Sequence, residues 1–352
     1  MKIFDYKCNT VPNTEYFSIN PKEAVFFDIE TTGFSALSGT IYLIGAVYFE
    51  NEEYRLTQWF ADSPASEADI IKAFFERIGN FKYLIHFNGD SFDIPFIAKR
   101  CQKLGIKPIF ENIFSIDIYK RIQHYRKMLC LGSTRQKSIE IFLGISREDE
   151  FDGGKLINVY KEYLHNNSEE KLNLLLLHNH DDMLGMLSIL DIFKFEAIKN
   201  HSESEVFIEK YDETSVLITA VFPENFPAPF SHRGDWFYMV CSANKLKVKI
   251  NLFKGELKHF FANYRDYFYL PLEDMAVHKS VAIYVDKEHR QKATKENCFV
   301  KKSGTFLPVF DTLGYDAFGT SYGNDSYIEL KEAFMDNKDF AKAYFDSIIE
   351  HL

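Results

Sequence analysis

Three apolar runs lie close together near the start of the chain and constrain its fold more than any other feature. They read AVFFDIE at 24–30, TIYLIGAVYFE at 40–50 and EYRLTQWF at 53–60. Short runs rich in β-branched and aromatic residues, separated by clusters of Gly, Ser and Asn, are typical of strands joined by turns. We therefore expect an antiparallel start to a β-sheet in this region.

Helical patterns follow these strands. Ser66 and Asp69 resemble a capping box at the start of an expected helix through 70–78, and the run YLIHF at 83–87 predicts a fourth strand. The later elements expected are a helix at 96–104, an extended segment at 113–117, helical stretches around Lys120, Ser138 and Val159, and a long helix at 168–199. Strands followed by helices indicate an α/β fold, with a mixed sheet flanked by helices.

The pattern of residue types in the sequence changes after about residue 200. Short runs of Tyr, Phe and Val are separated there by turn signals such as FPENFPAPF and SHRGD. Because 352 residues suffice for two domains, we expect a mixed α/β domain at 1–200 and a smaller β-rich domain at 201–352.

Charge and cysteine content limit the function classes. The formal net charge of -10 argues against a protein that coats nucleic acid through an overall positive field. The five cysteines form no C-x-x-C pair, which disfavours a zinc site or a disulfide framework and favours a reducing compartment. Since no apolar run approaches the roughly 18 residues of a membrane span, we expect a cytoplasmic protein with no membrane partner.

Two acids stand at the end of the first apolar run. Asp28 and Glu30 are two residues apart, so on a strand both carboxylates project from the same face. Two like charges beside a buried strand favour a bound cation, and hard divalent ions such as Mg²⁺ prefer carboxylate oxygens. The alternative is a solvent-facing edge strand that carries two incidental acids.

Two further polar segments carry chemistry. Asp93 stands where a helix is expected to begin, so it is either a functional acid or a plain helix cap. His178 and Asp182 are at positions i and i+4 of the long helix and share a face, which suits a metal site and its base as well as a solvated polar turn. Asp181 competes with Asp182 for this role, and the spacing from His178 favours Asp182.

The segments FDIETTG at 27–33, NGDSFD at 88–93 and 178–182 follow one another in the order of three known motifs. Together they resemble the DEDD branch of the ribonuclease H-like superfamily, the 3′-to-5′ exonucleases that include proofreading domains. Within that branch the sequences of the three motifs most resemble those of a bacterial family of predicted exonucleases with a ribonuclease H-like domain. The resemblance covers about 24–199 and implies a ribonuclease H-like fold for this half.

The resemblance also implies roles for individual residues. It assigns metal ligation to Asp28, Glu30, Asp93 and Asp182, with two divalent cations, Mg²⁺ or Mn²⁺, about 3.5–4 Å apart at the scissile phosphate. It implies hydrolysis of DNA or RNA to 5′-mononucleotides and contacts from Thr31 and Asn88 to the terminal nucleotide.

The third motif departs from the family pattern. The tyrosine subgroup has Tyr four residues before its acid, and the histidine subgroup has His five residues before it. Here His178 stands at the tyrosine spacing, so its role is either general base or orienter of the attacking water.

Two basic segments are candidates for nucleic-acid contact. Residues 118–139 hold several Lys and Arg but no acid, and Lys137 is the favoured phosphate contact, against an ordinary solvated helix face. Residues 245–302 interleave Lys and Arg with Phe and Tyr, which fits either a stacking platform or, as we prefer, a β-domain core with Lys on its outer face.

The sequence thus predicts a metal-dependent 3′-5′ exonuclease whose partner is nucleic acid, with single-stranded 3′ ends expected. A catalytically weak or inactive nucleic-acid-binding protein on the same fold is the main alternative. A structure-specific endonuclease with the same four acids is another, because pocket closure rather than ligand identity sets the polarity of attack.

Overall fold

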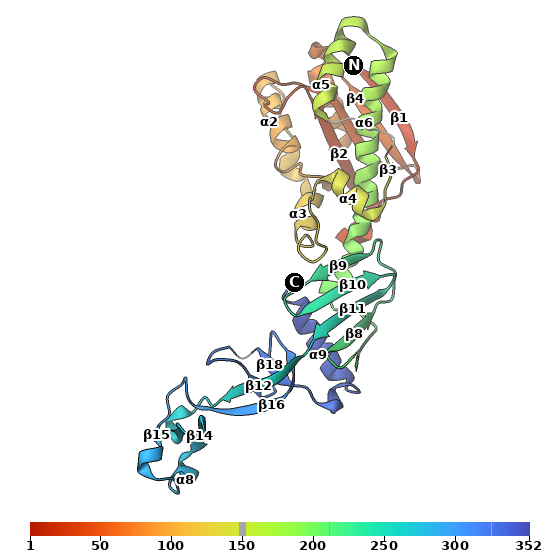
Figure 1. Cartoon of the computed structure of the whole chain (residues 1–352). Coiled ribbons are helices and arrows are strands. Elements are labelled where there is room, and N and C mark those ends of the chain that lie inside the picture. Colours follow the sequence, from red (N-terminus) through yellow and green to blue (C-terminus); the bar gives the residue numbers. More distant parts are fainter. Residues whose placement is uncertain (148–152, 211, 325) are drawn as a thin grey trace. The chain divides into compact units, whose positions relative to one another are not determined.

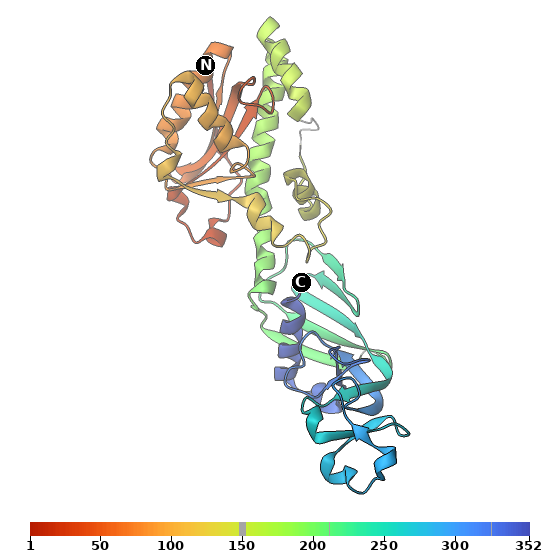
Figure 2. The ribbon, with the colours of Figure 1, turned by 90° about the vertical axis from the view of Figure 1, so that its left-hand side faces the viewer.

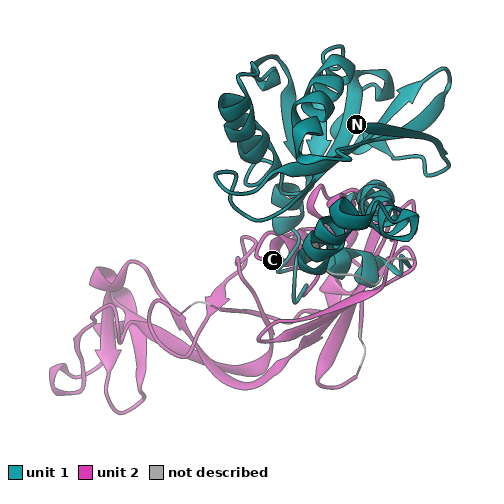
Figure 3. Ribbon diagram, turned by 90° about the horizontal axis from the view of Figure 1, so that it is seen from above, with its two compact units in different colours: residues 1–127, 131–194 teal, residues 128–130, 195–352 magenta. Residues whose placement is uncertain are grey.

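The computed structural model describes residues 1–147, 153–210, 212–324 and 326–352. The chain forms two compact units (Figure 3). Unit 1 comprises residues 1–127 and 131–194, and unit 2 comprises residues 128–130 and 195–352. The division near residue 194 falls slightly before the position of about 200 expected from the sequence.

Unit 1 is built on a mixed six-stranded sheet (Figure 1). Its strands are β1 (Lys2–Cys8), β2 (Ala24–Thr31), β3 (Ile41–Glu50), β4 (Glu53–Phe60), β5 (Tyr83–His86) and β6 (Phe114–Asp117). The order across the sheet is β1-β4-β3-β2-β5-β6. The first four strands in this order pair antiparallel, whereas β2 with β5 and β5 with β6 pair parallel, which confirms the expected mixed sheet.

Helices cover both faces of this sheet. They are α1 (Glu67–Ile78), α2 (Asp93–Leu104), α3 (Ile118–Gln123), α4 (Gln136–Leu143), α5 (Gly153–Asn166) and α6 (Glu169–Ser188). In Figure 2 the orange α1 and α2 and the light green α5 and α6 lie on opposite sides of the sheet.

Each face of the sheet has its own apolar core. On one face, residues such as Phe27 pack with Phe74 of α1 and Ile97 of α2. On the other, Phe60 packs with Tyr160 of α5 and Leu175 of α6. Burial of each such side chain stabilises the fold by roughly 1.5–3 kcal/mol, so these two cores hold the three layers together.

Two elements differ from the sequence expectation. Strand β1 was not anticipated, because as a mostly exposed edge strand it lacks a clear apolar pattern. The long helix ends at Ser188 and continues as a 3-10 segment, Ile189–Phe195, before α7 (Glu196–Lys199). Ile189, Ile192 and Phe195 are fully buried at a spacing of three, which suits the three residues per turn of a 3-10 helix better than an α-helix.

Unit 2 is β-rich, as expected. Its strands are β7 (Glu205–Lys210), β8 (Ser215–Val221), β9 (Phe230–Arg233), β10 (Phe237–Ser242), β11 (Lys245–Asn251), β12 (Phe253–Phe260), β13 (Tyr267–Leu270), β14 (Met275–His278), β15 (Gln291–Lys292), β16 (Phe299–Pro308), β17 (Ala317–Phe318) and β18 (Tyr327–Glu329). They form sheets in the orders β7-β8-β11-β10-β9, β12-β16-β18-β17 and β14-β13-β15.

Helices complete unit 2. The short α8 is Lys279–Ala282, and the C-terminal α9 is Lys338–Ile349, which packs against β7 and β8. Helix α9 was not anticipated from the sequence. Among the described residues of the whole chain, no helix is long and apolar enough to span a membrane.

Candidate active site

Strand β2 delivers two carboxylates to one face of the sheet. Its alternation sends Val25, Phe27 and Ile29 into the core shared with α1 and α2. Asp28 and Glu30, the residues between them, therefore face the side of the sheet covered by α6, which contacts β2. A shift of this strand by one residue would turn both acids into the apolar core, so the hydrophobic pattern determines where the acids lie.

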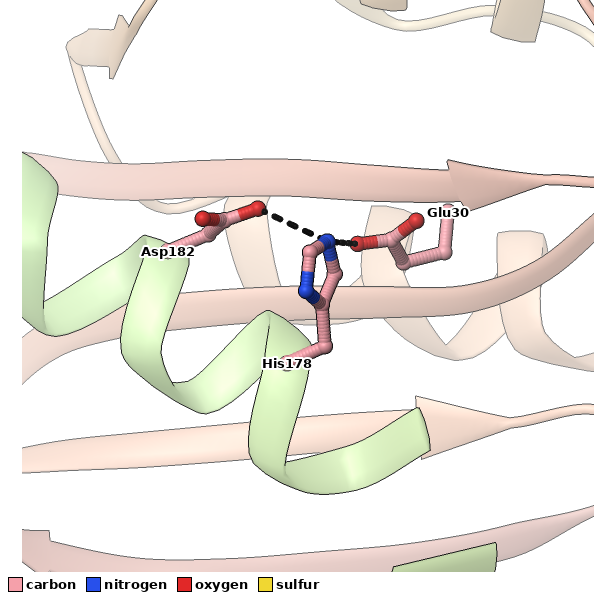
Figure 4. A group of neighbouring side chains, drawn as sticks. All are labelled: Glu30, His178 and Asp182. Atoms are coloured by element: carbon pink, nitrogen blue, oxygen red, sulfur yellow. Dashed lines mark ion pairs between the residues drawn. The ribbon is translucent and has the colours of Figure 1, made fainter. Parts of the chain in front are cut away.

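His178 and Asp182 of α6 meet Glu30 of β2, as Figure 4 shows. His178 Nε2 lies 3.5 Å from Glu30 Oε1 and 3.3 Å from Asp182 Oδ2. Ligand atoms of the three residues all lie within 4.8 Å of one another. Nitrogen and carboxylate donors at this spacing offer a site for a metal ion, and the imidazole is placed to hold or transfer a proton.

Asp28 is held by a side chain of α6 that the sequence analysis had not singled out. Asn179 Nδ2 donates a hydrogen bond of 3.1 Å to Asp28 Oδ2, and Asn179 Oδ1 accepts one of 2.9 Å from Gln58 Nε2. Gly45 of β3 is paired with Asp28, and a Cβ at Gly45 would come within 2.2 Å of Asn179 Oδ1. Glycine at this position therefore allows α6 to approach the sheet and bring Asn179 to Asp28.

Two of the acids have raised pKa values. Burial raises the pKa of Asp93, the first residue of α2, to about 7, although hydrogen bonds from the backbone amides of Ile29 and Asp93 lower it. Burial, followed by the charges of Asp93, Glu30 and Asp182, raises the pKa of Asp28 well above its ordinary range. The acids repel one another in a poorly hydrated setting, and a bound cation would relieve that repulsion.

A single cavity of about 700 Å³ collects these groups. It is lined by Asp28, Ile29, Glu30, Phe87, Asn88, Phe92, Asp93, Arg135, Gln136, Lys137, Ser138, Arg147, His178 and Asp182. The structure thus brings together the four acids proposed as ligands, the histidine of the third motif, and two of the three residues proposed to bind substrate. Four carboxylates around one cavity are a donor set that fits hard divalent cations.

Other residues of the three motifs lie outside this lining. Thr31 Oγ1 donates a hydrogen bond of 3.0 Å to the backbone oxygen of Gly33, so its expected contact with the terminal nucleotide stays a prediction. Asp181 is buried and lies 3.4 Å from His180 Nδ1. The side of α6 that faces the cavity therefore carries Asp182 rather than Asp181.

Arg147 is a cavity residue that the sequence analysis missed. Its guanidinium pairs with Asp182, and its Nη1 lies 3.2 Å from Glu140 Oε2. Gln136 Nε2 donates hydrogen bonds of 3.0 Å to Glu140 Oε1 and 2.7 Å to the backbone oxygen of Asp182. The basic stretch considered in the sequence ended at residue 139, and no local pattern marks Arg147 as a partner of a helix that follows much later.

The basic stretch itself faces several directions. Arg135 and Lys137 line the cavity. Lys120 instead donates a hydrogen bond of 2.6 Å to Asp90, and the guanidinium of Arg121 lies over an aromatic ring at 4.7 Å from its centroid. Only part of the positive charge read from the sequence is therefore directed at the acidic centre.

The aromatic and basic block of unit 2 is largely engaged in its own packing. Phe261 and Tyr267 stack with ring centroids 4.5 Å apart, within a small core that also includes Tyr264 and Tyr269. The nitrogen Nδ1 of His278 accepts a hydrogen bond of 3.4 Å from the backbone amide of Ser280 in α8. These contacts agree with the preferred interpretation of this block as a β-domain core.

Fold and cavity together define a mixed α/β domain that carries a cluster of acids. Residues 25–193 match the family model described as the RNase_H superfamily. A DNA polymerase of Pyrococcus glycovorans is 36% identical over 92 residues, which cover 23% of this chain and 12% of the polymerase. A DNA polymerase of Thermococcus aggregans is 36% identical over 91 residues, which cover 23% of this chain and 5% of that protein.

Among solved structures, the family B DNA polymerase from the hyperthermophilic archaeon Pyrobaculum calidifontis is similar with a TM-score of 0.39 at 11% identity. That match covers 69% of this chain and 34% of the polymerase chain. The chain therefore matches only a small part of the length of these polymerases in sequence. Its first half is an RNase H-like domain with homology to a segment of DNA polymerases.

Proposed function

We propose that the protein is a metal-dependent 3′-5′ exonuclease that hydrolyses phosphodiester bonds of DNA or RNA to 5′-mononucleotides. One observation carries this proposal. Asp28 and Glu30 of β2, Asp93 of α2 and Asp182 of α6 come from distant parts of the chain and line one cavity. Burial raises the pKa of both Asp28 and Asp93, and the charges of Asp93, Glu30 and Asp182 raise that of Asp28 further, which is unusual for chance surface acids.

In this proposal the four acids hold two divalent cations, Mg²⁺ or Mn²⁺. When bound, such a pair of ions lowers the pKa of a water and stabilises charge on the attacking and leaving oxygens of an in-line displacement. The raised pKa values of Asp28 and Asp93 fit this role, because a bound cation would favour the ionised form of both carboxyls.

The remaining cavity residues supply proton transfer and positioning. His178 Nε2, between the carboxylates of Glu30 and Asp182, is placed to accept a proton from the attacking water or to orient it. Asn88 and Lys137 line the same cavity and are proposed to contact the terminal nucleotide and a phosphate. The β-rich residues 201–352 form an accessory domain in this proposal.

The expected substrate is a single-stranded 3′ end, and the expected compartment is the cytoplasm.

The test is incubation of the purified full-length protein with oligonucleotides labelled at the 5′ end, in Mg²⁺ or Mn²⁺ and in EDTA. A ladder of products shortened one nucleotide at a time, abolished by EDTA, is the expected result. Internal cuts would indicate an endonuclease. No cleavage of DNA or RNA in either metal would overturn the proposal. Asp28→Asn is the matched inactive variant, and Asp69→Asn, an exposed acid in the first turn of α1, is the control.

A second candidate function is nucleic-acid binding without turnover. One observation favours it: the guanidinium of Arg147 already pairs with Asp182, so a protein cation stands beside a proposed metal ligand. Binding of oligonucleotides that is unaffected by Mg²⁺ or EDTA, in a protein that never cleaves them, would support this candidate.

A further inference from the structure

The turn at 87–92 joins β5 to α2 and carries Asn88 into the cavity. Asn88 has a φ of 64°, in the left-handed region, which Asn adopts more readily than most residues with a side chain. Its backbone amide donates a hydrogen bond of 2.9 Å to Asp117 Oδ1 at the end of β6. The hydrogen bonds of this turn to its surroundings therefore determine where Asn88 points.

His86, the last residue of β5, supplies one of these contacts. The backbone amide of Gly89 donates a hydrogen bond of 2.9 Å to His86 Nδ1. Because an amide N–H only donates, Nδ1 accepts, and the neutral ring carries its proton on Nε2. His86 is fully buried, and that burial lowers its pKa, which keeps the ring neutral near pH 7.

The proton on Nε2 continues into a chain of hydrogen bonds. His86 Nε2 lies 2.7 Å from Ser115 Oγ of β6. Ser115 Oγ in turn donates to Asp90 Oδ1, and Asp90 Oδ2 accepts a hydrogen bond of 2.6 Å from Lys120 Nζ. In this series of hydrogen bonds the histidine donates to the serine. In a hydrolytic triad the direction is the opposite, because the nucleophilic serine gives its proton to the histidine. This Ser–His–Asp group therefore stabilises the turn at 87–92 and is not a second hydrolytic centre.

The fit between His86 and the turn is also steric. A Cβ added at Gly89 would lie 2.6 Å from His86 Cγ, so the imidazole fills the space that a side chain at Gly89 would need. The ring also makes a T-shaped contact, with centroids 5.7 Å apart, with Phe27, the neighbour of Asp28 in β2. The turn is thus held from two sides, by His86 at Gly89 and Asp90 and by Asp117 at Asn88.

We propose that His86, in the Nε2-protonated form, is a positioning residue that locks the turn at 87–90 and so presents Asn88 to the terminal nucleotide of the substrate. The part that concerns substrate rests on the proposed nuclease function. His86 touches no reacting atom and acts through Asn88. Its effect is therefore expected in substrate binding, in KM more than in kcat.

The first experiment is independent of activity. In ¹⁵N NMR of selectively labelled full-length protein at pH 7, His86 Nδ1 is expected at the shift of an unprotonated nitrogen and Nε2 at that of a protonated one. A protonated Nδ1 would overturn the proposal. In His86→Phe, which keeps a buried ring without its hydrogen bonds, hydrogen exchange of the Gly89 amide should rise about tenfold or more, and unchanged exchange would contradict the lock.

The second experiment is a double-mutant cycle on the Kd for a single-stranded oligonucleotide, measured with Ca²⁺ in place of Mg²⁺. Asn88→Ala and His86→Phe are each expected to raise Kd up to about tenfold. The double variant should be no weaker than Asn88→Ala, because His86 acts through Asn88. Multiplied effects in the double variant would overturn the positioning role.

Two further variants complete the double-mutant cycle, one as a conservative replacement of His86 and one as a control. His86→Asn, whose side-chain oxygen is able to accept from Gly89, should recover most of the affinity and serves if His86→Phe does not fold. His165→Phe, at an exposed position of α5, is the matched control and should leave Kd unchanged. If the wild-type protein neither binds nor cleaves oligonucleotides, the nuclease proposal fails, while the NMR and exchange results still decide whether His86 locks the turn.

Discussion

Asn179 of α6 donates a hydrogen bond of 3.1 Å to the carboxylate of Asp28 in β2. This contact ties the helix that carries His178 and Asp182 to the strand that carries Asp28 and Glu30. Gln58 of β4 fixes the other end of the Asn179 amide through its Oδ1. The site is therefore assembled by a buried polar network between helix and sheet as well as by the apolar cores.

We predict that Asn179→Ala weakens both stability and the response to metal. The change removes the hydrogen bond that lowers the pKa of Asp28, and it leaves Gln58 Nε2 with one partner fewer. We expect these losses to lower the free energy of unfolding by about 1–3 kcal/mol. Loss of a residue that orients a ligand should reduce metal affinity or turnover about 10- to 100-fold. Urea unfolding and Mn²⁺ titration measure the two effects. Asn173→Ala, an exposed asparagine of the same helix, is the control and should change neither.

We predict that Gly45→Ala destabilises unit 1. The new methyl group would lie 2.2 Å from Asn179 Oδ1, so the Asn179 amide must leave its hydrogen bonds with Asp28 and Gln58 or α6 must shift, at a cost of about 1–3 kcal/mol. Thermal unfolding measures this. Gly132→Ala is the control, because a Cβ at Gly132 meets nothing within 4 Å. Equal midpoints for the two variants would show that α6 does not depend on this close approach.

We predict that the metal-free protein loses stability as pH rises from about 4 to above 7. A carboxyl whose pKa is raised by folding binds more protons in the folded than in the unfolded state in this range, so the stability present at low pH is lost as pH rises through the folded value. For Asp93, whose pKa is about 7, the loss is of the order of 4 kcal/mol.

The measurement is the difference in unfolding free energy between wild type and Asp93→Asn at several pH values, without metal, which cancels the other titrating groups. The wild type should lose stability relative to the variant across this window. A difference that is constant with pH would contradict the raised pKa of Asp93. Saturating Mg²⁺ should flatten the curve of the wild type, since a bound cation favours the ionised carboxyls.

We predict that Asp28→Asn reduces turnover to near background while the protein stays folded. The substitution removes a half-buried charge that three neighbouring acids oppose, so the metal-free variant should be at least as stable as the wild type at pH 8. Thermal unfolding with and without Mn²⁺ tests this. The wild type should gain stability with Mn²⁺ and the variant much less. Strong destabilisation of the metal-free variant would show that Asp28 has a structural role instead.

The local patterns of the sequence were enough for the layered fold of the first half. The apolar runs at 24–30, 40–50 and 53–60 became β2, β3 and β4, because side-chain alternation and turn residues act over a few positions. The same alternation placed Asp28 and Glu30 on one face, and the spacing of four placed His178 and Asp182 on one side of α6.

The sequence by itself determined which acids were available and which face of each element carried them, since both follow from the local repeat of strand and helix. Only the tertiary structure decided what meets them. Arg147 reaches Asp182, Asn179 reaches Asp28 across Gly45, and His86 braces the turn before Asp93. Such contacts join residues far apart in the chain, and they depend on how closely helices approach the sheet, a distance that no periodicity encodes.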